Sequence, residues 1–110
     1  MEIEAVPPID PTTLKTWLDE GRVVLIDVRE SHEHAEERIA GAKLVPLSTF
    51  DPARLAAERD LHVVLHCLAG SRSARALTTL AQAGFERLHN LHGGIIAWKA
   101  AGLPTVRGHG

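Results

Sequence analysis

Residues 63–73 read Val-Val-Leu-His-Cys-Leu-Ala-Gly-Ser-Arg-Ser, which is an apolar run, a short turn and the first residues of a helical pattern. The segment contains Cys67, the only cysteine of the chain. A strand that ends at this cysteine, followed by a glycine-containing turn and a helix, points backbone N–H groups and a helix N-terminus at one sulfur atom. These conditions convert a thiol into a thiolate, so Cys67 is the first candidate functional residue.

Outward from this segment, short apolar runs alternate with helical patterns. Val23–Asp27 is a continuous aliphatic run that ends in a carboxylate, which is typical of a strand buried on both faces of a parallel sheet. The alternation favours a single α/β domain over residues 1–110, with a mainly parallel five-stranded sheet, helices on both faces and a flexible tail at 105–110. We predict further strands at residues 3–6, 43–45, 62–66 and 87–91, and helices at 11–20, 32–38, 52–59, 71–83 and 94–101.

Two of the predicted helices begin with the same pattern. Residues 9–11 read Ile-Asp-Pro, in which the aspartate is expected to cap the helix, the proline to occupy its first position and the isoleucine to pack on Leu14. Residues 50–52, Phe-Asp-Pro, repeat this order, with Leu55 in position to meet the phenylalanine. The short polar helix at 32–38 is expected to be capped by Ser31 or its neighbours.

Composition excludes several classes of function. Charged residues make up 24% of the 110 residues and the net charge is -2, so no basic surface for nucleic acid is expected; aromatic residues, at 4%, are too few for base stacking. No apolar run approaches the length of a membrane span, and the acidic N-terminus lacks the apolar region of a secretory signal. One cysteine excludes an internal disulfide, so we expect a cytoplasmic protein with a reduced thiol.

Two polar side chains follow predicted parallel strands, where ligands bind in α/β sheets: Asp27 and Cys67. A lone cysteine after an aliphatic strand is most often a small buried hydrophobe. Here Gly70 permits a loop that turns its amides inward, and Arg72 stands at a helix start, where the macrodipole disfavours a cation unless it faces an anion. For Arg75, facing an anion and plain solvent exposure remain equally open.

Together these segments resemble single-domain rhodanese-like sulfurtransferases, and the resemblance covers nearly the whole chain. It implies a three-layer fold and transfer of a sulfane sulfur from thiosulfate or another persulfide donor to cyanide or a thiol. The motifs carry the resemblance because they occur together in the family's order, whereas each alone is weak. The segments are Val24–Glu30 (Val-Leu-Ile-Asp-Val-Arg-Glu), Ile39–Ala42, Cys67–Ser73, Leu91–Trp98 and Gly102–Pro104.

The resemblance also implies residue roles. Cys67 is expected to be the nucleophile that carries the persulfide, with Arg72 as the second catalytic residue, contacting an anionic donor. Asp27 and Arg29 are expected to support the site from behind through hydrogen bonds and ion pairs. The remaining loop residues are expected to bind the substrate: Leu68, Ala69, Gly70, Ser71 and Ser73.

Partners and cofactors follow from the same resemblance. The partners are a small-molecule or protein sulfur donor and a thiol acceptor, and the reaction needs no metal or organic cofactor. Because the cradle carries little positive charge, we expect modest affinity for thiosulfate. Two alternatives remain: a binding or regulatory module without turnover, and a Cys-dependent phosphatase or arsenate reductase of the same fold. Phosphatases of this fold use a loop one residue longer than the six residues from Cys67 to Arg72.

The chain departs from the family pattern in one segment. The usual Gly-His-Ile-Pro-Gly-Ala is Glu-Arg-Ile-Ala-Gly-Ala at residues 37–42, where Arg38 adds a charge near the rim of the site. His34 stands where the family often has an aromatic residue. We expect these changes to affect local packing and the choice of partner. Seven histidines raise the question of a metal site, but zinc needs three or four convergent ligands and these histidines are expected to be ordinary polar residues. The pairs considered are His32/His34, His62/His66 and His89/His92.

Overall fold

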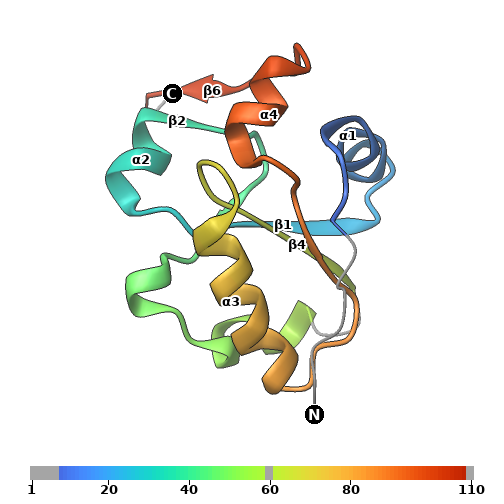
Figure 1. Cartoon of the computed structure of the whole chain (residues 1–110), viewed down its shortest axis with the longest axis vertical. Helices are drawn as coiled ribbons and strands as arrows, with labels where there is room; N and C mark the ends of the chain where they lie inside the picture. Colours follow the sequence, from blue (N-terminus) through green and yellow to red (C-terminus); the bar gives the residue numbers. More distant parts are fainter. Residues whose placement is uncertain (1–7, 59–60, 109–110) are drawn as a thin grey trace.

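The computed structural model describes residues 8–58 and 61–108 (Figure 1). Four parallel strands form the central sheet, and a second sheet of two short antiparallel strands lies near the C-terminus. Helices and strands follow one another along the chain in this order: α1 (Pro11–Asp19), β1 (Val23–Asp27), α2 (Ser31–Glu36), β2 (Glu37–Arg38), β3 (Lys43–Leu44), η1 (Leu47–Thr49), η2 (Pro52–Glu58), β4 (His62–His66), α3 (Ser71–Gln82), β5 (Leu88–Asn90), α4 (Gly94–Ala100) and β6 (Val106–Arg107).

The central sheet has the strand order β3-β1-β4-β5. Within the described residues it has four strands rather than the five expected, and the strand predicted at residues 3–6 lies outside them. Ile9 nevertheless extends the sheet beside β5, since it forms a parallel bridge with Leu91 and its N–H donates to the Asn90 carbonyl at 3.0 Å. The α/β class with a parallel sheet flanked by helices is confirmed.

The sheet is covered on both faces, which explains why its strands are continuously apolar. Leu25 and Val64 face the core beneath α1 and α4, whereas Ile26 and Leu65 face the core beneath α3. Figure 1 shows α1 and α4 on one side of β1 and β4 and α3 on the other. The alternation of successive side chains between two apolar layers produces the three-layer architecture.

The strand order places a switch point at the carboxyl ends of β1 and β4. From β1 the chain crosses to β3 on one side, and its next long strand, β4, pairs with β1 on the other side. The two carboxyl ends are in register, since Asp27 pairs with His66. In open α/β sheets, the crevice outside such a switch point is where ligands bind.

The predicted start of α1 is confirmed, and the second Asp-Pro start forms a different helix. Asp10 caps α1 by accepting a hydrogen bond from the Thr13 N–H at 2.8 Å. The equivalent segment after Asp51 forms the 3₁₀ helix η2 rather than an α-helix, with Leu55 buried in the core. Leu55 is the one buried residue of this segment.

The segment around α2 differs from the prediction. The helix ends at Glu36 rather than at Arg38. Its N-cap is Glu30, a neighbour of Ser31 as expected, and Glu30 and Glu33 form a reciprocal capping box. The next residues form β2, which pairs antiparallel with β6. Residues 105–108 therefore do not form the expected tail, because backbone pairing with Glu37–Arg38 holds them against the end of α2. Among the described residues no helix has the length and apolar character needed to span a bilayer.

Candidate active site

Cys67 lies directly after β4, at the floor of a loop that leads into α3. Its side chain is 1% exposed. The Gly70 N–H donates to the Cys67 sulfur at 3.0 Å, and the Ser73 hydroxyl lies 3.5 Å from it. Gly70 has φ +122, a value that L side chains rarely adopt, and this conformation turns the loop amide back toward the sulfur.

Ser73 links the sulfur to the end of β5. Its hydroxyl has three acceptors within reach: Asn90 Oδ1 at 2.6 Å, the Gly70 carbonyl at 3.1 Å and the Cys67 sulfur. The Asn90 amide also donates to the Gly70 carbonyl at 3.3 Å. Because both residues hold the same carbonyl, the turn of the loop is fixed from behind.

The surroundings of Cys67 favour its ionised form. Burial raises the pKa of the thiol. Hydrogen bonds from the Ser73 hydroxyl and from the amides of Ser73, Gly70 and Ala69 together lower it by more than burial raises it, so the pKa lies below its usual value. The amides act on the charged sulfur because they are fixed donors in a site that water enters little. The loop therefore favours the thiolate, the nucleophilic form of cysteine.

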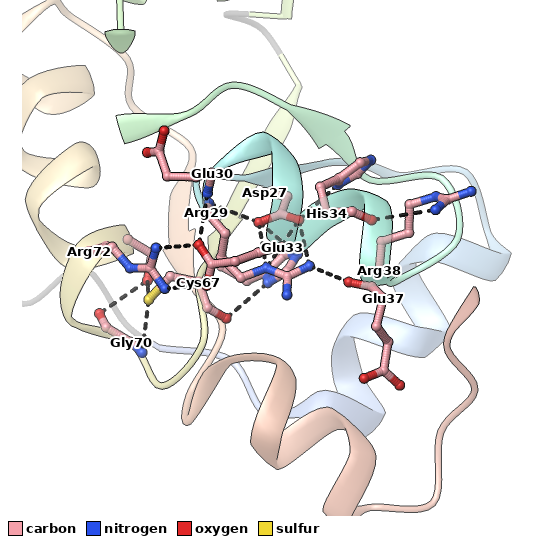
Figure 2. A network of polar contacts seen from close by, with 12 residues as sticks. Asp27, Arg29, Glu30, Glu33, His34, Glu37, Arg38, Cys67, Gly70 and Arg72 are labelled. Carbon is pink, nitrogen blue, oxygen red and sulfur yellow. Dashed lines mark hydrogen bonds and ion pairs between the residues drawn. The ribbon is translucent and has the colours of Figure 1, made fainter. Parts of the chain in front are cut away.

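Arg72 does not donate to the sulfur; its fork holds a carboxylate from α2. Its two terminal nitrogens donate to the two Glu33 oxygens at 2.7 and 3.0 Å. Hydrogen bonds from Arg72 are the main reason that the pKa of Glu33 falls to about 2, so this carboxylate stays ionised near neutral pH. Figure 2 shows the Arg72 guanidinium beside the Glu33 carboxylate and near Cys67.

Asp27 and Arg29 form a buried ion pair behind the loop. The Arg29 Nη2 lies 2.8 Å from Asp27 Oδ2, and the Arg29 backbone N–H donates to Asp27 Oδ1 at 2.9 Å. His34 Nδ1 donates to the same carboxylate at 2.9 Å, and Arg29 also donates to the Glu37 carbonyl at 2.6 Å. Burial raises the pKa of Asp27, but Arg29 and the two nearby histidines lower it more, so the pKa lies below its usual value.

His66 is fully buried between the ion pair and the loop. Its Nδ1 donates to the Cys67 carbonyl at 3.1 Å, and its Nε2 lies 3.8 Å from Asp27 Oδ1 without a hydrogen-bond partner. Burial is the main cause of a lowered His66 pKa, so the ring is neutral near physiological pH. As expected for the residue before the nucleophile, the ring supports the loop from behind.

The start of α4 packs against the back of the same loop. The Ile95 and Ile96 N–H groups donate to the carbonyls of Cys67 and Leu68 at 3.0 and 3.2 Å. Gly94 permits this approach, because a Cβ there would lie 2.4 Å from the Leu68 carbonyl oxygen. Three elements (β4, α3 and α4) therefore determine the position of the loop.

A small hollow opens beside the loop, between α2 and α4. Two exposed apolar side chains border it: Leu68 is 45% exposed and Ile96 is 53% exposed. Ile95 lines it as well, and the remaining residues are charged, with more carboxylates than cations: Arg29, Glu33, Glu36, Glu37 and Lys99.

The structure brings most of the predicted site residues together around Cys67. Glu33 and Asn90 were not among the predicted site residues; Glu33 stands at the capping-box position of α2 and Asn90 at the end of β5. The histidine pairs differ from those considered, since His62 lies beside His89 at 3.3 Å, on the adjacent strand. Within residues 8–58 and 61–108 no three metal-ligating side chains converge.

Comparison with known proteins agrees with this geometry. The profile of the rhodanese-like domain matches residues 10–101. The chain is 38% identical over 106 residues to a sulfurtransferase of Allochromatium vinosum, covering 96% of this chain and 99% of that protein. It is 42% identical over 99 residues to an uncharacterized protein of Synechocystis sp., covering 90% of this chain and 55% of the relative. The solved thiosulfate sulfurtransferase of Pseudomonas aeruginosa is 35% identical with a TM-score of 0.79, covering 92% of this chain and 19% of that chain.

Proposed function

This chain belongs to the rhodanese-like domain family, and on that premise we propose that it is a sulfurtransferase that carries a sulfane sulfur on Cys67. The donor is thiosulfate or another persulfide donor, and the acceptor is a thiol or cyanide. The observation that carries the proposal is the buried Cys67 sulfur beneath the Gly70 amide and the Ser73 hydroxyl, where its pKa is lowered. The sulfurtransferase of similar length from Allochromatium vinosum supports the same reaction.

The transfer takes two steps. In the first, the Cys67 thiolate attacks the outer sulfur of the donor; with thiosulfate, the donor S–S bond breaks, sulfite leaves with the bonding electrons, and Cys67 becomes a persulfide anion. In the second, the acceptor attacks the outer persulfide sulfur and the Cys67 thiolate is released. Each step conserves charge and needs no further oxidant or reductant.

The loop stabilises the anion that both steps require. The amides of Ala69, Gly70 and Ser73 lower the pKa of the thiol, and as fixed donors they also hold a persulfide anion without reorganising. The loop spans six residues from Cys67 to Arg72, which favours a transferred sulfur atom over a tetrahedral phosphate. This length argues against the phosphatase alternative.

Mass spectrometry of the intact protein tests the proposal. After incubation with thiosulfate the wild-type protein is expected to gain the mass of one sulfur, and cyanide is expected to remove it and release thiocyanate. Cys67→Ser is the matched control, because it keeps the size of the side chain and removes the nucleophile. Equal thiocyanate production by the two proteins would overturn the proposal, and a folded wild type that accepts no sulfur from thiosulfate or an organic persulfide would instead favour the binding module.

A further inference from the structure

The arginine that a dianionic donor needs is already bound to a carboxylate. Both terminal nitrogens of Arg72 donate to Glu33, at 2.7 and 3.0 Å. The two side chains remain partly exposed, 30% and 23%, so the pair lies at the rim of the site rather than in the core. A donor that uses the same fork must displace Glu33.

Other cations beside the hollow are paired in the same way. Arg29 binds the buried Asp27, and Lys99 binds Glu37 at 2.8 Å. Glu36 adds a carboxylate to the same lining. The hollow beside the Cys67 loop therefore lacks the excess positive charge that attracts dianions.

We infer that Glu33 is a specificity-determining residue, which neutralises Arg72 and so selects against dianionic sulfur donors in favour of donors that carry one charge or none. The inference rests on the proposed function, because selection among donors has meaning only if Cys67 accepts sulfur. Glu33 acts through Arg72, so it is a positioning residue, not a catalytic one.

Coulomb's law gives the size of the effect. Removing a unit negative charge that lies several ångströms from the reacting sulfur, in water-like surroundings, raises the local concentration of a monoanion on the order of threefold and that of a dianion, whose charge is doubled, on the order of tenfold. Neutral reagents are unaffected by this change. The charge of the reagent therefore separates the proposed role from a general change in loop structure.

Glu33→Gln is a suitable variant because it preserves the fold of α2. Glu33 Oε1 also accepts the Glu30 N–H at 2.9 Å in the capping box, and a glutamine oxygen accepts the same bond. The glutamine oxygen still accepts from Arg72 Nη1, but the amide has no charge and cannot accept from Arg72 Nη2, so Arg72 loses its ionic partner and one of its two hydrogen bonds. Glu36→Gln is the matched control. It removes an exposed carboxylate from the same helix and the same hollow, and Glu36 is not part of the Glu33–Arg72 pair.

The test measures two rates at Cys67, alkylation by iodoacetate and sulfur loading from thiosulfate. Each is divided by the rate of alkylation by neutral iodoacetamide. This ratio cancels any change in the thiolate fraction. In Glu33→Gln the rate with iodoacetate is expected to rise about threefold and the rate of sulfur loading from thiosulfate about tenfold, with smaller rises in Glu36→Gln. Added salt is expected to reduce these differences.

The outcomes distinguish this inference from the proposed function. Unchanged ratios in a folded Glu33→Gln protein would overturn the inference, and so would an equal rise in Glu36→Gln, since general acidity and not the Arg72 pair would then act. If the iodoacetate ratio rises but thiosulfate loads no sulfur onto either protein, the electrostatic role of Glu33 stands and the proposed function fails with this donor.

Discussion

At the scale of single residues, Ser73 controls the charge state of Cys67 more than any other side chain. Its hydroxyl has one hydrogen but several acceptors, with Asn90 Oδ1 at 2.6 Å and the sulfur at 3.5 Å. When the thiol ionises, the sulfur becomes the stronger acceptor and the hydroxyl hydrogen gains by turning toward it. Asn90 therefore competes with the thiolate for the same hydrogen.

We predict that Ser73→Ala raises the pKa of Cys67. Burial raises this pKa and the Ser73 hydroxyl opposes that effect, so removing the hydroxyl leaves burial less compensated. In a pH profile of iodoacetamide alkylation, the variant is expected to react more slowly than the wild type near neutral pH and at the same rate at high pH, where both are thiolates.

Thr78→Ala serves as the control for Ser73→Ala, since it removes an exposed hydroxyl from the same helix, α3. Its alkylation profile is expected to match that of the wild type. A Ser73→Ala profile that also overlays the wild type would show that the backbone amides alone set the pKa.

At the scale of the elements, α4 holds the loop through its first turn. A Cβ on Gly94 would lie 2.4 Å from the Leu68 carbonyl oxygen and 2.7 Å from that of Cys67, so the loop and the helix cannot both keep their places. We expect the loop to move rather than the helix, and this displacement moves the amides that face the Cys67 sulfur.

We therefore predict that Gly94→Ala abolishes sulfur loading of Cys67 and destabilises the fold. Gly102→Ala separates the two causes, because both glycines have positive φ, +63 and +78, but Gly102 has no atom within 4 Å of the added Cβ. The control is expected to lose about 1–2 kcal/mol of unfolding free energy from backbone strain alone and to keep its activity. Urea unfolding and mass spectrometry after thiosulfate treatment give the two readouts; similar losses in both variants would contradict the steric explanation.

The elements also show which parts of the site the sequence could predict. The loop between β4 and α3 was predictable because Cys67 follows an aliphatic strand and Gly70 follows at turn spacing, both local signals. Glu33 and Asn90 were missed because their partners, Arg72 and Ser73, lie 39 and 17 residues away, and only tertiary packing brings them together. The pairing of β2 with β6 was missed for the same reason, since two-residue strands leave no periodic pattern.

At the scale of the whole molecule, ion pairs join elements that are distant in the sequence. Arg72 on α3 holds α2 through Glu33, and Lys99 on α4 holds β2 through Glu37. Asp27 anchors Arg29 beneath them, in the core. These three carboxylates have pKa values below their usual ones, and that of Glu33 is about 2. Protonation of these three carboxylates therefore weakens the ion pairs that join the elements.

This arrangement predicts a fold that loses stability in acid. A carboxylate whose pKa is lower in the folded protein than in the unfolded chain stabilises the fold above the unfolded pKa, and this contribution is lost as the pH falls through the folded pKa. The loss is expected to begin near the ordinary values of 3.8 and 4.5 and to continue to about 2, the pKa of Glu33. The loss is measured as a fall in the urea midpoint of unfolding between pH 7 and pH 2.5.

Asp27 should account for most of this loss, because it is completely buried while Glu33 and Glu37 are mostly screened by solvent. Asp27→Asn is therefore expected to be less stable than the wild type at pH 7, by about 3–5 kcal/mol, since Arg29 loses its buried partner. Its urea midpoint is expected to change much less with pH, whereas that of Glu33→Gln should keep most of the wild-type slope. A Glu33→Gln variant as insensitive to acid as Asp27→Asn would mean that the rim pair, not the buried pair, controls acid stability.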